Sequence, residues 1–236
     1  MKHGFKALRG LALWALGVLT CSSAVGQIAA PAVLYTSFQA PPPTRVMETI
    51  QEEVAAIMLP VGIRLEWRSL PETRDYRVAA DLAVISFKGR CDISGMKAFS
   101  QSSGVLGLTH VSEGEIIPFA DVDCDRIRGF LQGDLMRERA RERERLYGRA
   151  IARVVAHELY HIFANTPEHG SCGIGKSAYF ASELLSDDFH FEKRDLITLR
   201  NGPTMINLEN AANASNEAPL DSGTVGSVDV LKHTVR

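Results

Sequence analysis

The sequence predicts an α+β fold in which a small mixed sheet packs on helices. Two segments carry apolar residues at helical spacing, one over 44–59 and one over 134–164. Four short segments between them have the apolar alternation or continuity typical of strands: 63–67, 82–87, 105–111 and 116–122. The predicted order is therefore a helix, two strands, a hairpin and a second, longer helix.

The composition is that of a globular protein. The chain has 236 residues, of which 45% are hydrophobic and 23% are charged. This length suits one domain, and a domain of this size buries roughly 70% of the surface that its unfolded chain exposes. The net charge of −2 argues against nucleic acid as a partner, because proteins that bind polyanions are usually basic.

Residues 1–26 have the pattern of a secretory signal peptide. Basic side chains precede an apolar run over 11–20, and small residues follow, with cleavage expected before Gln27. The run is too short to cross a bilayer unaided. We therefore expect an exported protein, periplasmic or secreted, that has no contact with a membrane after signal removal. The alternative is a lipoprotein anchored at Cys21.

The first part of the mature chain is expected to contain one helix after an irregular start. Residues 27–43 end in Ala-Pro-Pro-Pro and are expected to form an extended lead-in. Thr44 can cap a helix that runs to about Leu59 with one apolar face. Pro60 and Gly62 then end it.

The strands differ in their expected burial. Segment 63–67 alternates like a half-buried strand, whereas 82–87 is nearly continuously apolar, like a central strand. Segments 105–111 and 116–122 flank Ser-Glu-Gly-Glu and are expected to form a hairpin. Pro118 favours an edge position for the second of these strands, because proline cannot donate a ladder hydrogen bond.

The second half of the chain is expected to be helical and then irregular. The long helical segment 134–164 begins with a stretch of mixed charge and becomes apolar from about residue 151. A short helix is expected at 177–185. Residues 202–236 are polar and aperiodic, and are expected to form a disordered tail. The folded domain should therefore span 44–201.

Three cysteines remain if the signal peptide is removed. An exported protein meets an oxidising compartment, in which disulfides persist. Cys91 and Cys124 each follow a predicted strand and are the disulfide candidates, which leaves Cys172 over. The sequence alone leaves the other pairings open.

Residues 154–163, VVAHELYHIF, carry the motif with chemical content. His157 and His161 lie four residues apart on the predicted helix, so both imidazoles project from one face and can bind one metal ion. Glu158 can accept a proton from a water molecule that Zn²⁺ activates. Without a metal, burying these polar side chains on an apolar helix would cost desolvation free energy with no compensation. The motif therefore predicts a zinc site.

With this HExxH motif the chain resembles the zincin clan of zinc metallopeptidases, and in particular exported bacterial zincins. The order of predicted elements is similar to that of the minimal zincin domain, in which an extended peptide binds along an edge strand. The resemblance implies that 44–201 form a zincin-like catalytic domain. It also implies a peptidase that hydrolyses peptide or protein substrates, with Glu158 as general base and zinc as cofactor.

The third zinc ligand is expected to be His169. Metzincins continue the motif as HExxHxxGxxH, whereas this chain has Ala164 at the glycine position and reads HExxH-x7-H. Asn165 can end the helix in the left-handed conformation and Pro167 prevents its continuation, so the chain can turn back to the metal. In gluzincins a glutamate from a following helix is the ligand, which makes Glu183 the main alternative. Weaker candidates are Glu168, Asp187, His190 and His110.

Two further candidates concern the surroundings of the motif. Tyr179 is a candidate transition-state stabiliser because of its position after the loop that follows His169. The hairpin strands 105–111 and 116–122 can offer a free edge to an extended substrate.

Two other functions are weighed against the peptidase. One is a catalytically inactive, zinc-bound binding or scaffold protein of the same fold, against which the intact Glu158 argues. The other is a nucleotide-binding module, because the Gly170–Ser177 loop, GSCGIGKS, matches G-x4-G-K-[ST]. Such a loop follows a buried strand, whereas residues 162–169 are predicted to be a helix end and a proline turn.

Overall fold

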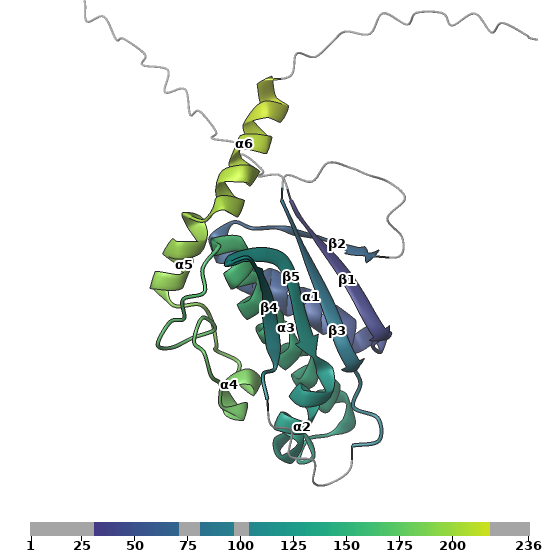
Figure 1. Cartoon of the computed structure of the whole chain (residues 1–236). Helices are drawn as coiled ribbons and strands as arrows, with labels where there is room; N and C mark the ends of the chain where they lie inside the picture. Colours follow the sequence, from purple (N-terminus) through teal and green to yellow (C-terminus); the bar gives the residue numbers. More distant parts are fainter. Residues whose placement is uncertain (1–30, 71–80, 97–103, 218–236) are drawn as a thin grey trace, which may run out of the picture.

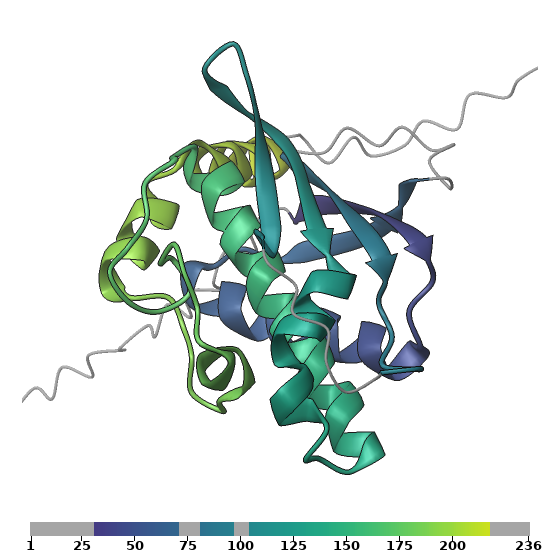
Figure 2. The same ribbon diagram turned by 60° about the horizontal axis from the view of Figure 1, so that its bottom comes forward.

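A computed structural model of the protein describes residues 31–70, 81–96 and 104–217. The expected signal peptide with Cys21, residues 27–30 of the lead-in and residues 218–236 of the tail lie outside these ranges. The described part forms a five-stranded sheet with two helices, at 44–58 and 140–164, packed on one face (Figure 1). Figure 2 shows the same two layers from another side. The predicted α+β class agrees with this architecture.

The sheet is mixed, and its strand order is β2-β1-β3-β5-β4. The strands are β1 (Ala32–Ala40), β2 (Leu65–Ser69), β3 (Leu82–Arg90), β4 (Gly107–Ser112) and β5 (Glu115–Asp123). Neighbours among β2, β1, β3 and β5 are parallel, whereas β4 is antiparallel to β5 and lies at the edge. The expected hairpin is confirmed as β4 and β5, and the expected central position of segment 82–87 is confirmed by β3.

The expected lead-in at 27–43 is extended over 32–40, but this stretch belongs to the sheet and does not merely precede the fold. Residues Ala32–Ala40 form β1, which pairs with β2 on one side and β3 on the other. Ala32 and Leu34 are fully buried in the core. The segment AVLYTSFQA is rich in apolar and aromatic residues, but its pairing partners lie more than thirty residues away in the sequence, so the local pattern did not reveal them.

Pro118 did not place its strand at the sheet edge. β5 lies between β3 and β4. Its ladder with β3 begins at the pair Val84↔Phe119, one residue after the proline. On the other side, the register with β4 shifts between Thr109 and Val111, opposite the proline. The missing N–H therefore falls where neither ladder is regular.

Seven helical segments complete the described part: α1 (Thr44–Met58), the 3-10 helix η1 (Leu59–Val61), α2 (Cys124–Leu135), α3 (Ala140–Ala164), α4 (Ala181–Leu185), α5 (Lys193–Arg200) and α6 (Pro203–Glu217). α3 is the longest and runs beside α1 under the sheet (Figures 1 and 2). Among the described residues, no helix is both long and apolar enough to cross a membrane.

A glycine allows α1 and α3 to approach closely. A Cβ on Gly148 of α3 would lie 3.0 Å from the backbone oxygen of Val46 and 2.9 Å from the Cβ of Thr49. Glycine is unfavourable inside a helix by roughly 1 kcal/mol relative to alanine. Here it permits contact between the helices, and the buried face of α1, which includes Ile50 and Val54, packs into the core.

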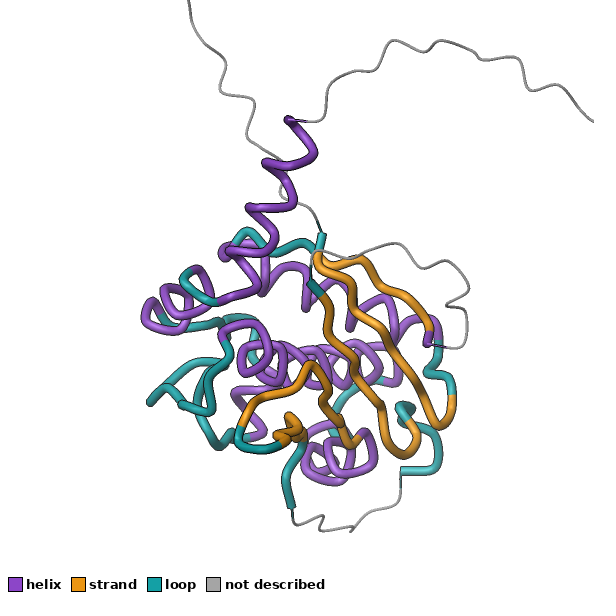
Figure 3. The backbone as a smooth tube through the Cα atoms, turned by 45° about the horizontal axis from the view of Figure 1, so that its top comes forward, coloured by secondary structure: helices purple, strands orange, loops and turns teal. Residues whose placement is uncertain are grey.

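Two helix expectations were corrected. The long helix begins at Ala140 and not near 134, because α2 occupies Cys124–Leu135 as a separate helix. The expected tail is helical over its first part, since Pro203–Glu217 form α6, which extends from the body of the molecule in Figure 3. Leu208 of α6 is fully buried and Met205 nearly so, and these contacts with the core order a segment with little local helical signal.

A disulfide joins Cys91, which directly follows β3, to Cys124, the first residue of α2. This is the pair that the sequence suggested. Cys172 is an exposed free thiol. The disulfide therefore fixes the start of α2 to the end of a central strand.

Candidate metal centre

Helix α3 positions the first two histidines. His157 and His161 are one turn apart and both are buried. The helix ends at Ala164, and Asn165 adopts the left-handed conformation with a φ of 48°, as its sequence position predicted. The chain then reverses, which brings His169 back over the helix.

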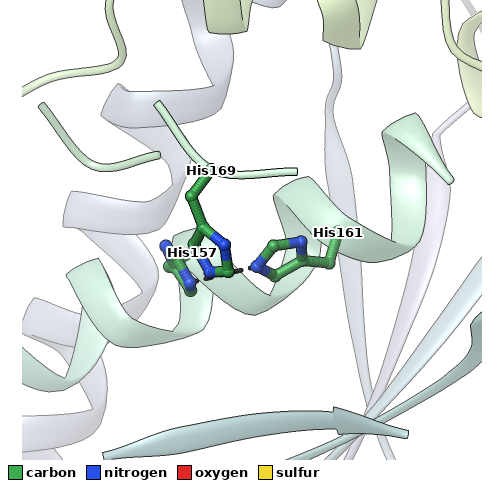
Figure 4. A group of neighbouring side chains, drawn as sticks. All are labelled: His157, His161 and His169. Carbon is green, nitrogen blue, oxygen red and sulfur yellow. Dashed lines mark hydrogen bonds between the residues drawn. The ribbon is translucent and has the colours of Figure 1, made fainter. Parts of the chain in front are cut away.

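The three histidines converge. Their ligand atoms all lie within 4.8 Å of one another, and the Nε2 atoms of His157 and His161 are 3.1 Å apart. Figure 4 shows that His157 and His161 project from one helix, whereas His169 approaches from a separate segment that crosses above them. The side chain of His169 is exposed. The structure thus brings together the three residues expected to hold a metal ion.

The imidazole rings of His157 and His161 each direct a lone pair to the place where the three histidines converge. His157 Nδ1 lies 2.8 Å from the carbonyl oxygen of Ile174, and His161 Nδ1 lies 2.7 Å from that of Thr166. Because a carbonyl oxygen only accepts, each Nδ1 carries the hydrogen and each neutral ring has its lone pair on Nε2. Burial lowers the pKa of His157 to about 4 and also lowers the pKa of His161. Two facing lone pairs favour a shared cation.

Glu158 is buried beside these ligands, with 4% of its surface exposed. Its Oε2 accepts a hydrogen bond from Thr109 Oγ1 at 2.7 Å. Burial raises the pKa of Glu158 to about 7, because the charged form loses its hydration. A carboxylate with such a pKa is suited to exchange protons near neutral pH.

A cavity of about 560 Å³ opens over the histidines and Glu158. Its other walls are largely apolar and come mainly from the segment before β4, from the hairpin and from α2: Val105, Leu106, Leu108, Val111, Ile116 and Phe130. A reacting group and an apolar side chain can therefore be accommodated together next to the metal ligands.

Tyr179 lies on the other side of His157 from the metal ligand atom. Its hydroxyl is 2.8 Å from His157 Nδ1 and donates to the carbonyl oxygen of Ile174. Because Nδ1 and Nε2 are on opposite sides of the imidazole, the hydroxyl is placed to orient a metal ligand. Tyr179 also lines the cavity, and its expected role in stabilising a transition state stays a prediction.

The alternative third ligand, Glu183, is not brought to the histidines. Lys176 Nζ donates to both of its carboxylate oxygens, at 2.5 and 2.6 Å. The same carboxylate accepts a hydrogen bond from the backbone N–H of Phe180 at the start of α4. Glu183 therefore pairs with a lysine and caps a short helix.

The weaker candidates are also outside the cluster of described metal-ligating groups, which contains three histidines. Asp187 pairs with Arg149 at 2.6 Å, His110 with Asp121 at 3.3 Å, and His190 with Asp188 at 3.1 Å. Glu168 likewise does not belong to the cluster. His169 thus has no rival in the described part of the chain.

The Gly170–Ser177 loop lacks the context of a phosphate-binding loop. It follows the end of α3 and an irregular segment, not a buried strand. Its lysine, Lys176, is engaged by Glu183. The loop instead supports the histidines, since the carbonyl oxygen of Ile174 accepts from His157.

Sequence reasoning missed the groups that orient the motif. Thr109 contacts Glu158 across 49 positions of sequence, and the Ile174 carbonyl contacts His157 across 17. The alternation of 105–111 placed Gly107 and Thr109 on one face of a strand. Nothing in the sequence indicated that this face meets α3.

The sequence was compared with protein-family models and with curated proteins. A scan against protein-family models and a search of curated proteins found no match to this chain. The function is therefore inferred from the histidines, Glu158 and the cavity that they line.

Proposed function

We propose that the protein is an exported zinc metallopeptidase with a zincin-like catalytic domain. One observation carries this proposal: three imidazoles converge beside a buried carboxylate, on the floor of a cavity next to an edge strand. A helix, a mixed sheet with an antiparallel edge strand, and an HExxH helix behind it support the likeness to zincins.

The ligand set fits zinc. Zn²⁺ binds imidazole nitrogen at about 2.0–2.1 Å, and tetrahedral geometry then places two such nitrogens about 3.3 Å apart. The distance of 3.1 Å between the Nε2 atoms of His157 and His161 is close to this value. Three protein ligands with one open position are the pattern of catalytic zinc sites. His157, His161 and His169 would hold the ion.

Glu158 supplies the acid–base chemistry in this proposal. A zinc ion at the histidines would activate a water molecule and polarise the substrate carbonyl. Glu158 accepts a proton from the attacking water and then passes it to the leaving amine.

The substrate proposed is an extended peptide. In the described part of the chain, β4 ends the sheet, so one of its edges pairs with no strand. A peptide can add to such an edge through backbone hydrogen bonds. The apolar wall formed by Leu108, Val111 and Phe130 favours a substrate with an apolar side chain near the scissile bond.

Export is supported by the disulfide. Cys91 and Cys124 are joined, and disulfides persist in oxidising compartments such as the periplasm or the extracellular space. This agrees with the signal-peptide pattern of residues 1–26.

The metal part of the proposal is tested by zinc content per chain. We expect about one zinc in the mature protein, purified without a histidine tag. His169→Ala should lose most of it, whereas the matched control Glu183→Ala should keep it, because Glu183 pairs with Lys176. A protein that takes up no zinc, even when zinc is added, would exclude the proposal.

The catalytic part is tested with Glu158→Gln. This variant should keep zinc and lose roughly 10²–10⁴-fold in the hydrolysis of a peptide library, the usual contribution of a general base. Zinc binding without cleavage by the parent protein would favour the inactive binding protein. Equal cleavage by parent and variant would exclude Glu158 as the base.

A further inference from the structure

The hydroxyl of Thr109 holds the carboxylate of Glu158. Thr109 Oγ1 donates to Oε2 at 2.7 Å and lies 3.3 Å from the backbone oxygen of Glu158. Among the described residues, only Thr109 gives hydrogen bonds to this carboxylate: one from its hydroxyl, and one from its backbone N–H, which any substitution at 109 other than proline retains. Hydrogen bonds to an ionised acceptor are roughly twice as strong as neutral ones, so this contact is well suited to fix the orientation of Glu158.

The strand that carries Thr109 also confines the other carboxylate oxygen. Gly107 lies two residues earlier on the same face of β4, and a Cβ there would be 2.3 Å from Glu158 Oε1. Helix α3 fixes the backbone of Glu158 but leaves its side chain several rotamers. The edge strand, and not the helix, therefore selects among these rotamers.

We propose that Thr109 is a positioning residue that orients the Glu158 carboxylate for proton transfer. The proposal rests on the peptidase function proposed above, in which Glu158 is the general base. Thr109 itself exchanges no proton with the substrate. Because β4 is also the strand along which a peptide would bind, one element sets the position of both the substrate and the base.

The test compares substitutions that separate the hydroxyl from the shape of the side chain. Thr109→Val removes the hydroxyl at nearly constant volume, and Thr109→Ser keeps it. Thr36→Val is the matched control, since Thr36 lies on β1 and its hydroxyl contacts the backbone oxygen of Arg68. All four proteins are assayed for zinc content, kcat and KM.

Thr109→Val should lower kcat about tenfold to hundredfold, as is usual for residues that orient a catalytic group. Its KM and zinc content should stay unchanged. Thr109→Ser should retain most of the kcat, and Thr36→Val should match the parent. A kcat for Thr109→Val equal to that of the parent would overturn the proposal, and so would an equal loss in Thr109→Ser.

A second readout does not depend on hydrolysis. Metal-free protein labelled with ¹³C at glutamate carboxyl carbons gives a signal for Glu158 that is assigned by its absence in Glu158→Gln. Thr109→Val should shift this signal, and Thr36→Val should not. An unshifted signal would overturn the proposal. If the signal shifts but the parent protein cleaves no peptide, the hydrogen bond between Thr109 and Glu158 is confirmed. The proposed peptidase function is then excluded, and so is the proposed role of Thr109 in positioning a general base.

Discussion

At the scale of single residues, the metal centre depends on which nitrogen of each imidazole carries the hydrogen. The carbonyl oxygens of Ile174 and Thr166 hold the Nδ1 hydrogens of His157 and His161. Both Nε2 atoms are thereby left as acceptors before any metal arrives. The histidines are thus prepared as ligands by groups outside the HExxH motif.

Tyr179→Phe tests the contribution of the tyrosine to this preparation. Removing the hydroxyl should weaken zinc binding about tenfold to hundredfold, because His157 loses a partner at Nδ1. Hydrolysis at saturating zinc should persist. Competition with a chelator measures the affinity, and Tyr35→Phe, whose hydroxyl contacts Arg68, is the control. Unchanged affinity with lost hydrolysis would instead support a role of Tyr179 in stabilising the transition state.

The metal-free protein should show the effect of burying Glu158. Its pKa is raised to about 7 in the folded state, so the unfolded chain loses this proton at lower pH. The free energy of unfolding of the parent should therefore fall, relative to Glu158→Gln, as the pH rises from about 4.5 to 7, by on the order of 3 kcal/mol. Urea denaturation of both metal-free proteins at pH 5 and pH 8 measures it. The same difference at both values would contradict this account.

At the scale of elements, the site is made where the edge strand β4 meets helix α3. Gly107 and Thr109 face the helix and contact Glu158, while the reversal after α3 returns His169 over the same helix. Close packing of strand on helix requires a residue without a side chain at 107.

Gly107→Ala should therefore impair catalysis without removing the metal. The added Cβ would meet Glu158 Oε1 at 2.3 Å and Val154 Cγ1 at 2.8 Å, so the carboxylate or the strand must move. We expect a loss of about 10²-fold in kcat, the cost of a small misplacement, with zinc content retained. Gly133→Ala on α2 is the control, because its Cβ would meet nothing within 4 Å. Full activity in Gly107→Ala would contradict the close contact.

At the scale of the whole molecule, the core is built around α3, which contacts helices on several sides and the sheet above it. The buried Arg153 joins α3 to Glu53 of α1 and to the backbone oxygen of Glu183 in α4. The segment after α3 is thereby tied to the rest of the core. This tie favours a fixed position for the loop that contains Ile174 and Tyr179.

The disulfide acts at the same scale. It links positions that are 33 residues apart, and removing such a link should lower the free energy of unfolding by about 2–5 kcal/mol. The double substitution Cys91→Ser with Cys124→Ser, compared with Cys172→Ser in denaturant titrations, measures this effect. The control should match the parent because Cys172 is exposed and free. Equal stability of all three proteins would contradict it.

Much of the centre was predictable because its signals are local. Helical periodicity alone puts His157 and His161 on one face. Asn165 and Pro167 predict the chain reversal that brings His169 back to His157 and His161. The same reasoning identified helix α1, strand β3 and the β4–β5 hairpin, whose patterns span only a few residues each.

The sequence by itself therefore determined that His157 and His161 can share a metal ion with Glu158 beside them, and it favoured His169 over Glu183 as the third ligand. Only the tertiary structure decided the pairing of Glu183 with Lys176, the place of Tyr179 behind His157, the contact of Thr109 with Glu158, and the burial of β1 within the sheet. The physical reason is separation along the chain. Local backbone preferences act over a few residues. Strand pairing and buried hydrogen bonds join residues that are far apart in the sequence, so they form only when the tertiary structure packs together.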